Sequence, residues 1–335
     1  MNNRPENIIG HSSTLAKTLE HVSRLASINR PVLVVGERGT GKELITERLH
    51  FLSTRWNNPL LKVNCAAISN DLLESELFGH EPGAFTGANR IHHGRFERAD
   101  GGTLFMDEVG TMSLRLQEKL LRLIEYGEFE RLGGQQTLSS DVRVVAATNI
   151  DLKALAESDR FRKDLLDRLS FDVIHVPPLR HRTDDIPELA QHFAVQMCRD
   201  LGWEYFPGFT DAAMKVLHSH DWPGNIRELK NVIERSVYRW AEPAKPVAEI
   251  IIDPFQPPYQ DSAVEGPREE NVSQQTDSKT QGNFTEQVNR FGRQLLTSTL
   301  KKNHDHQGRT AKELGLTYHQ LRGLLRKYDL VGKRN

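Results

Sequence analysis

The sequence predicts an α/β protein, in which a parallel β-sheet covered by helices on both faces leads into an all-helical subdomain, a linker and a small helical module. Three observations support this prediction. Short apolar segments alternate with amphipathic helical segments up to residue 176, the strand-like segments then stop, and the composition changes near residue 257. Alternation of strands and helices is typical of a mainly parallel sheet with helices on both faces.

Five segments have the character of buried strands. Each is short, mostly aliphatic or β-branched, and bounded by Gly, Asn, Asp or Pro. They are Val32–Val35, Leu60–Val63, Thr103–Met106, Val142–Ala147 and Phe171–Val176. Amphipathic helices lie between them, such as the one that places Leu116, Leu120 and Leu123 on one face. We therefore assign residues 1–178 to the α/β subdomain.

The rest of the chain divides into three parts. Helical patterns at 193–201, 211–220 and 225–240 predict an α-helical lid subdomain over residues 179–255. Residues 256–283 are rich in Pro and then in Gln, Ser, Asp and Glu, a composition that predicts a flexible linker. Helical spacing returns with Phe284, Val288, Phe291 and Leu295, which could form a dimer face. We assign 284–335 to a separate C-terminal domain.

Composition excludes several protein classes. Hydrophobic residues make up 37% of the 335 residues and charged residues 27%, as in soluble globular proteins. No apolar run is long enough to cross a bilayer, and the first residues do not resemble a signal peptide. The two cysteines, Cys65 and Cys198, lack metal-ligand spacing. We therefore expect a cytoplasmic protein that is neither membrane-spanning nor stapled by disulfides.

Charge is unevenly distributed along the chain. Residues 290–335 contain eleven Lys or Arg and three Asp or Glu, a net charge of +8, while the whole chain has a net charge of −1. The remainder therefore has a net charge of −9. A basic module on an acidic body indicates a polyanionic partner for the module, although a solvated basic tail would give the same count.

A phosphate-binding loop follows the first predicted strand. The motif G-x-x-x-x-G-K stands between a strand and a helix, which is the context that this motif requires. Glycines let backbone N–H groups surround phosphate oxygens, and the helix N-terminus attracts the same anion. The alternative is an ordinary glycine-rich turn. The candidate nucleotide-binding residues are Gly36, Glu37, Arg38, Gly39, Thr40, Gly41, Lys42 and Glu43.

An acidic pair supplies a Mg²⁺ ligand and a group that can polarise water, which the loop lacks. Glu43 stands where Ser or Thr usually binds Mg²⁺, so the metal must depend more on another carboxylate. Asp107 and Glu108 end the strand Thr103–Met106. Asp107 suits Mg²⁺ coordination and Glu108 suits polarising an attacking water. With the loop, these residues predict an ATPase that uses ATP and Mg²⁺.

The most specific signal is a hexapeptide with a small apolar tip. Its residues are Gly83, Ala84, Phe85, Thr86, Gly87 and Ala88. It resembles the GAFTGA loop of bacterial enhancer-binding proteins, the AAA+ activators of sigma-54 RNA polymerase. The flanking segments 76–81, 94–99, 161–165 and 221–229 also resemble that family, in which Glu43 is usual and Pro82 less usual. A tight turn that buries Phe85 is the alternative.

The resemblance implies roles for further residues. The 83–88 loop would contact sigma-54 RNA polymerase holoenzyme, and Asn64 would pair with Glu108 in one nucleotide state. Arg162 and Arg168 would reach the γ-phosphate of a neighbouring subunit, which requires a ring, usually a hexamer. If both arginines lie on one helix, six residues apart, their side chains point in directions about 120° apart around its axis, so both need not serve one surface. Pairing with Asp164 and Asp167 on an exposed helix is the alternative. Nucleotide sensors would be Thr148, Asn149 and Arg227, the last on a helix capped by Asn225.

The C-terminal domain has the pattern of a helix-turn-helix. Two short helices within Thr310–Lys327 flank Leu314-Gly315-Leu316-Thr317, where Thr317 is a plausible N-cap. With its basic charge, the region resembles the Fis-like domains of the same activators, which implies binding to double-stranded enhancer DNA. The candidate DNA-contacting residues are Thr317, Tyr318, His319, Gln320, Arg322, Arg326 and Lys327.

Segments 164–168 and 250–255 resemble the phage-shock branch of the family. The ATPase part begins near Ile8, so we expect no receiver domain before it. The branch implies inhibition in trans by phage shock protein A, with Trp56 as a candidate contact and simple packing of Trp56 as the alternative. A dimer at rest is possible beside the ring. A ring ATPase that processes DNA and a nucleotide-gated repressor are the rivals. The 83–88 loop argues against the first, and Glu108, Arg162 and Arg168 against the second.

Overall fold

The computed structural model describes residues 7–255, 284–303, 306–328 and 330. The chain separates into two compact units, Met1–Gln256 and Pro257–Asn335. None of the described helices is both long and apolar enough to span a bilayer.

A five-stranded parallel sheet forms the centre of the first unit. Its order is β2-β3-β6-β1-β7, and every neighbouring pair is parallel. The strands are β1 (Val32–Val35), β2 (Leu60–Asn64), β3 (Thr103–Asp107), β6 (Arg143–Thr148) and β7 (Val173–His175). All five predicted strands are therefore present, β1 with the predicted ends and the other four with one or both ends shifted by one or two residues. Parallel pairing brings the carboxyl ends of the strands to one edge, where ligands bind in open α/β sheets.

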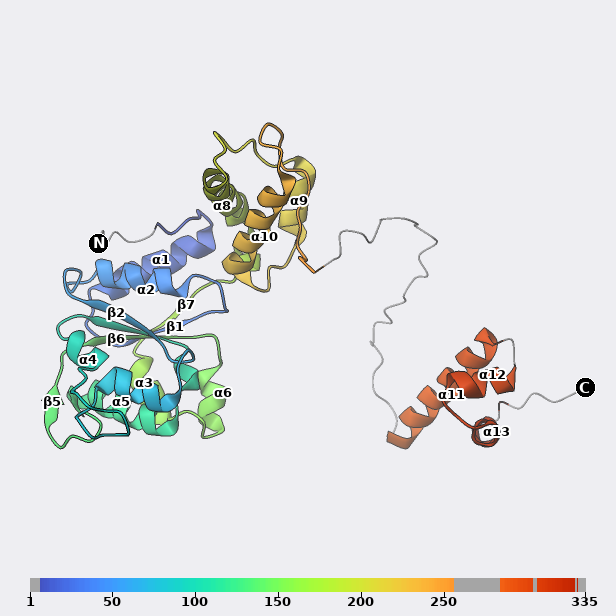
Figure 1. Ribbon diagram of the computed structural model, residues 1–335, viewed down its shortest axis with the longest axis horizontal. Helices are drawn as coiled ribbons and strands as arrows, with labels where there is room; N and C mark the ends of the chain where they lie inside the picture. The colour runs from blue at the N-terminus through green and yellow to red at the C-terminus, as the bar shows by residue number, and fades with distance from the viewer. Residues whose placement is uncertain (1–6, 256–283, 304–305, 329, 331–335) are drawn as a thin grey trace, which may run out of the picture. The chain divides into compact units, whose positions relative to one another are not determined.

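Two helical layers cover the sheet (Figure 1). On one face lie α1 (Ser13–Ala26) and α2 (Lys42–Phe51), which pack on Val32, Val34 and Val145. The opposite face packs Leu33 and Val144 against the second layer. That layer consists of α3 (Asn70–Phe78), α4 (Arg95–Arg98), α5 (Leu114–Tyr126), α6 (Leu152–Glu157) and α7 (Lys163–Leu169). Successive strand residues thus alternate between two apolar cores, as burial on both faces requires.

A small antiparallel hairpin was not predicted. Its strands are β4 (Glu128–Glu130) and β5 (Thr137–Ser139), and it follows α5 directly. Phe129 is its main anchor, buried in the core between Phe78 and Phe96. The hairpin matters because its connecting turn touches the 83–88 loop.

The helical subdomain comprises α8 (Ile186–Asp200), α9 (Asp211–Ser219) and α10 (Asn225–Trp240). Trp222 is fully buried at its centre, and its indole N–H donates to the Leu217 carbonyl at 2.9 Å. Its core includes Leu189, Phe193 and Ile233, and Ile9 from the N-terminal segment packs against it. This contact joins the N-terminal segment to the helical subdomain.

The second unit contains three described helices, α11 (Phe284–Lys302), α12 (Gln307–Glu313) and α13 (Tyr318–Lys327). Leu296, Ala311, Leu321 and Leu325 form its core. Gly315 has a φ of 64° in the turn between α12 and α13, a conformation that favours glycine. Of the predicted dimer face, Leu295 is exposed. The side chains of Phe284, Val288 and Phe291 lie outside the described residues, as does the linker 256–283.

Candidate functional site

The phosphate loop lies between β1 and α2, at the carboxyl edge of the sheet. Gly39 and Gly41 have φ values of 75° and 93°, which side chains rarely adopt, so glycine is needed at both. The loop curls around Lys42, whose buried ammonium donates to the carbonyls of Gly36 at 2.9 Å and Glu37 at 3.2 Å. A cation and a helix N-terminus thus face the same small volume, which is suited to polyphosphate.

Two carboxylates stand beside the loop. Asp107 ends β3 and Glu108 follows it with a φ of 56° and 8% exposure. Burial lowers the pKa of Lys42, and the negative charges of Asp107 and Glu108 oppose that shift. The ammonium and the two carboxylates therefore act on one another electrostatically.

Glu108 is held by Asn149 and Arg38. The Asn149 amide lies between them, and the orientation assigned to it, which satisfies both neighbours, has the nitrogen 2.5 Å from Glu108 Oε2 and the oxygen 3.0 Å from Arg38 Nε. Arg38 Nε itself is 3.9 Å from Glu108 Oε1. Asn64 lies opposite Asp107 in the sheet register, and its oxygen accepts from the backbone N–H of Ala66 at 2.9 Å. An Asn64–Glu108 pair is not present in this structure, and the nucleotide-dependent pairing stays a prediction.

A cavity of about 590 Å³ joins several predicted residues. It is lined by Gly39, Thr40, Gly41, Lys42, Glu43, Asp107 and Arg227. Glu43 pairs at its rim with Lys62 Nζ at 2.8 Å. Thr148 is buried close by at the end of β6 and bonds with the backbone of Ile150. The structure thus brings together the loop, an acidic residue and the sensor-like arginine.

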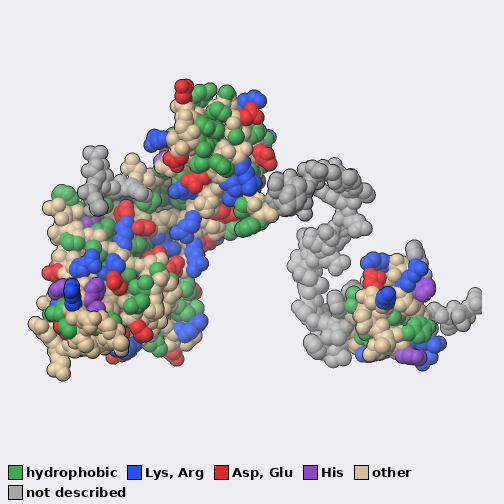
Figure 2. Space-filling view, in the orientation of Figure 1, with side chains coloured by type: hydrophobic (Ala, Val, Ile, Leu, Met, Phe, Trp, Pro, Cys, Tyr) green, Lys and Arg blue, Asp and Glu red, His purple; other side chains and the backbone are tan. Residues whose placement is uncertain are grey.

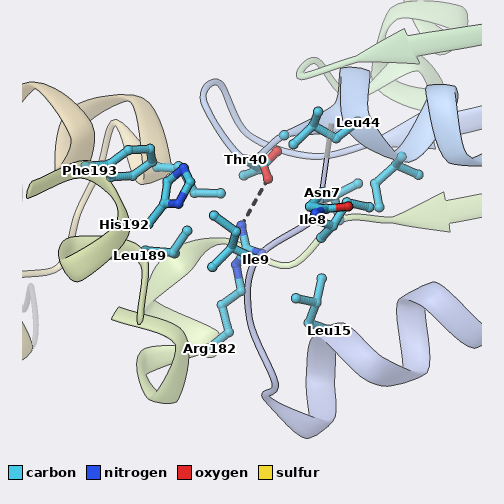
Figure 3. Close-up of a pocket in the computed structure, with 14 residues that line it drawn as sticks. Asn7, Ile8, Ile9, Leu15, Thr40, Leu44, Arg182, Leu189, His192 and Phe193 are labelled. Carbon is cyan, nitrogen blue, oxygen red and sulfur yellow. Dashed lines mark hydrogen bonds between the residues drawn. The ribbon is translucent and has the colours of Figure 1, made fainter. Parts of the chain in front are cut away.

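An apolar pocket of about 120 Å³ adjoins the loop (Figure 3). Ile8 and Ile9 from the N-terminal segment and His192 and Phe193 from α8 line it, and Thr40 and Gly41 are common to it and the larger cavity. An apolar slot beside a phosphate loop is suited to a nucleotide base. Sequence reasoning missed these residues because they come from distant segments, and no spacing relates them.

Asp185 fixes the N-terminal wall of this pocket. Its fully buried carboxylate accepts from the backbone N–H groups of His11 and Ser12 and from the Ser12 hydroxyl, each at 2.7 Å. Gly10 lies so close to it that a Cβ there would be 2.6 Å from the carboxylate carbon. These contacts hold Ile8 and Ile9 against the helical subdomain.

Asn225 does not cap α10 as predicted. Gly224 occupies the cap position, and Asn225 is the first helical residue, buried, with a φ of 55°. Asn tolerates this conformation better than most residues. Its side-chain oxygen accepts from the Leu179 backbone N–H at 2.8 Å rather than from its own helix.

The two predicted arginine fingers lie outside the cavity. Arg162 precedes α7 with an extended backbone and donates to both oxygens of Asp164, at 3.1 and 2.7 Å. Arg168 donates to Glu125 of α5 at 2.8 Å, not to Asp167. Because Arg162 lies before the helix, the helical angle expected between the two arginines does not apply. Both side chains are partly exposed on the surface.

The 83–88 loop is a tight turn with its tip exposed. Gly83 N donates to the Ala88 carbonyl at 2.8 Å, and Gly83 and Gly87 have positive φ values. Phe85 remains 44% exposed and contacts the His80 ring edge-on, with ring centroids 4.8 Å apart. The turn therefore does not bury Phe85, which was the alternative interpretation.

The predicted DNA-contacting residues gather on α13 and its first turn. Thr317 caps α13, and its hydroxyl accepts from the Gln320 N–H at 3.3 Å, as predicted. Figure 2 shows basic and histidine side chains on the visible face of this unit. All seven candidates are exposed, namely Thr317, Tyr318, His319, Gln320, Arg322, Arg326 and Lys327.

Comparison with known proteins places this site in a family. Residues 8–175 match the sigma-54 interaction domain, and residues 180–247 match the AAA+ ATPase lid domain. The Psp operon transcriptional activator of Escherichia coli K12 is 53% identical over 327 residues, which are 97% of this chain and 98% of that protein. The Nif-specific regulatory protein of Azotobacter vinelandii is 52% identical over 68% of this chain and 44% of its own length.

Solved structures that are similar to this chain include complexes with ATP and with ADP. NtrX from Brucella abortus in complex with ATP is 29% identical, with a TM-score of 0.68 over 96% of this chain and 70% of that one. Its complex with ADP has a TM-score of 0.67 at 30% identity over 96% of this chain and 69% of that chain. The α/β fold with a helical lid and the binding of ATP by an ATPase domain are therefore confirmed.

Proposed function

The chain belongs to the family of sigma-54-dependent transcription activators, and we propose that it uses ATP hydrolysis in a ring to remodel the closed sigma-54 RNA polymerase complex into an open one. One observation carries the proposal. The unit that holds the phosphate loop also presents Phe85 and Thr86 to solvent at the tip of a turn. Exposing a Phe between two glycines stabilises no monomer, so a partner surface is its best explanation.

The residues at the sheet edge fit MgATP. Lys42 and the loop N–H groups would hold the phosphates, and Ile8, Ile9 and Phe193 the base. Asp107 would bind Mg²⁺, which commonly uses one or two carboxylates together with substrate phosphates. The metal would neutralise charge on the phosphates. Glu108, oriented by Asn149, would accept a proton from the attacking water.

In a ring, each subunit would add residues to the nucleotide site of its neighbour. We propose that Arg162 and Arg168 exchange Asp164 and Glu125 for phosphate oxygens of a neighbouring subunit, most simply in a hexamer that forms from a dimer at rest. Thr148, Asn149 and Arg227 would sense the nucleotide, and Asn64 would take Glu108 in another state. Surface ion pairs contribute about 0–1 kcal/mol each, so their exchange would cost little.

The second unit would bring the activator to its promoters. We propose that α12 and α13 form a helix-turn-helix that binds double-stranded enhancer DNA through α13. The exposed basic side chains of that helix and its capped start support this proposal. The division into 1–178, 179–255, 256–283 and 284–335 is part of the proposal.

The likeness to the Psp operon activator suggests the regulatory setting. We propose that the chain controls a phage-shock operon in the cytoplasm and that phage shock protein A inhibits it. Trp56, which is 60% exposed, is the candidate contact.

Open-complex formation tests the main proposal. Sigma-54 holoenzyme on a phage-shock-type promoter should open with this protein and ATP, and should not open with a non-hydrolysable analogue. Thr86→Ala should hydrolyse ATP and fail to open the promoter, while Lys42→Ala should fail in both. Opening by Thr86→Ala at the full rate would refute the role of the loop.

A further inference from the structure

The side of the phosphate loop that faces away from the phosphate position, here called its outer side, is hydrogen-bonded to the helical lid. Four consecutive loop residues each accept a hydrogen bond from the lid or the segment that enters it. The pairs are Arg180 to the Glu37 carboxylate at 2.9 Å, Asn225 Nδ2 to the Arg38 carbonyl at 3.0 Å, Ile226 N to the Gly39 carbonyl at 3.0 Å, and Arg182 to the Thr40 carbonyl at 3.0 Å.

Asn225 lies at the centre of this contact. Its side-chain nitrogen also donates to Glu37 Oε2 at 3.1 Å, and its oxygen accepts from the Leu179 N–H at 2.8 Å. One fully buried side chain therefore joins the loop, the entry to the lid and the start of α10. Its left-handed backbone is what turns the side chain away from its own helix.

The two backbones also touch directly. A Cβ on Gly39 would lie 2.3 Å from the Gly224 carbonyl oxygen, which leaves no space for a side chain. The loop and the start of α10 consequently cannot shift independently without breaking the Ile226–Gly39 bond.

The physical consequence concerns the direction of the peptide groups. A loop that turns its N–H groups toward phosphate leaves its carbonyls in need of other donors. Lys42 donates to the carbonyls of Gly36 and Glu37, and those of the next three residues face the lid. The lid supplies three of these donors. A loop without them would have to be ordered when the nucleotide binds, which weakens binding.

We propose that Asn225, Arg180 and Arg182 are positioning residues that hold the phosphate loop in its nucleotide-binding conformation, so that loop geometry depends on the seating of the lid. The inference rests on the proposed role of Gly36–Lys42 in phosphate binding. It adds to that role a function for lid side chains that touch the loop from its outer side.

Asn225→Asp in the full chain tests the proposal. The aspartate keeps an oxygen that accepts from the Leu179 N–H, but it loses the amide nitrogen that donates to Glu37 and to the Arg38 carbonyl. It also places a second carboxylate next to that of Glu37. The dissociation constant for MgATP, from titration calorimetry, and the KM should each rise about tenfold, as loss of a buried hydrogen bond predicts. The kcat should change by less than about twofold, because positioning affects ground state and transition state alike. Gln196→Glu, the same charge change on an exposed residue of α8, should change neither constant.

A rescue separates positioning from simple damage. Adding Glu37→Gln to Asn225→Asp removes one carboxylate and supplies an amide that can donate to the other. The part of the lost affinity that comes from the two facing carboxylates should return, while the Arg38 carbonyl stays without its donor. If Asn225→Asp does not fold, Arg180→Ala, at an exposed position, should raise the dissociation constant about threefold. Unchanged affinity in the variant that folds, or no recovery in the double variant, would overturn the proposal. Lys42→Ala distinguishes the causes, because unchanged ATP binding there would remove the phosphate-loop assignment itself.

Discussion

Arg131 donates from Nε and Nη2 to the two carboxylate oxygens of Glu97, at 2.8 and 2.7 Å. Its Nη1 donates to Glu81 at 2.6 Å. Glu81 and Glu97 stand on either side of the 83–88 loop in the chain, and Arg131 follows β4. The Arg131 side chain, only 13% exposed, therefore ties both ends of the loop segment to the β4–β5 hairpin.

Replacing Arg131 should loosen that segment. Arg131→Ala would remove the arginine from two partly buried carboxylates and leave Glu97 with His93 and the Gly94 N–H as partners. We expect the free energy of unfolding to fall by about 2–3 kcal/mol. Promoter opening should fall further than ATPase activity, because the nucleotide residues do not contact Arg131. Chemical denaturation measures the first effect. The exposed Arg122→Ala is the matched control, with an expected change within about 0.5 kcal/mol; an equally small change for Arg131→Ala would contradict the assignment.

The same pair predicts an acid limit to stability. The hydrogen bonds from Arg131 are the main cause that lowers the pKa of Glu97 from 4.5 to about 2, and His93 adds to it. A carboxyl whose pKa is lower in the folded state stabilises that state above its unfolded pKa. Its contribution is therefore present above pH 4.5 and is lost as the pH falls toward 2. Denaturation of Glu97→Gln at several pH values in this window should show a shallower loss of stability than the unchanged chain. Parallel curves would refute the prediction.

The sequence predicted the features that are contiguous in the chain. The phosphate loop and the Asp107–Glu108 pair each follow a strand, and a parallel sheet necessarily brings strand ends together. The apolar pocket could not be predicted, since Ile8 and Phe193 meet only after the lid has folded onto the N-terminal segment. A local capping rule fails at Asn225 because its hydrogen-bond partners lie 46 and 187 positions away in the chain.

The hairpin shows a second reason for failure. Its strands have three residues each, and β4 reads Glu-Phe-Glu, which is too short and polar for a periodicity signal. Arg168 likewise contacts Glu125 because α5 and α7 pack together, which no local spacing reveals. Tertiary contacts, not propensity, decide both cases.

Glu108→Gln should separate binding from hydrolysis. The amide keeps the size of the side chain and its place beside Asn149, and it cannot accept a proton. We expect MgATP affinity to be retained and kcat to fall by roughly 10²–10⁴-fold, the usual contribution of a general base. Single-turnover hydrolysis gives the rate and calorimetry the affinity. A fall below tenfold would assign the base to another residue, with Asp107 the next candidate.

Arg322→Ala should weaken binding to enhancer DNA without unfolding the second unit. The side chain is exposed on α13, whereas Leu321 and Leu325 of the same helix are buried in the core with Leu296. If Arg322 contacts a phosphate, the slope of log affinity against log salt should decrease in magnitude by about one, equally for all sequences. If it contacts a base edge, discrimination should fall by about 1–3 kcal/mol at one position. Fluorescence anisotropy over a salt series distinguishes these cases, with the exposed Lys301→Ala of α11 as the charge-matched control. Equal effects from both variants would mean that α13 has no special place in DNA binding and that only the net charge of the unit matters.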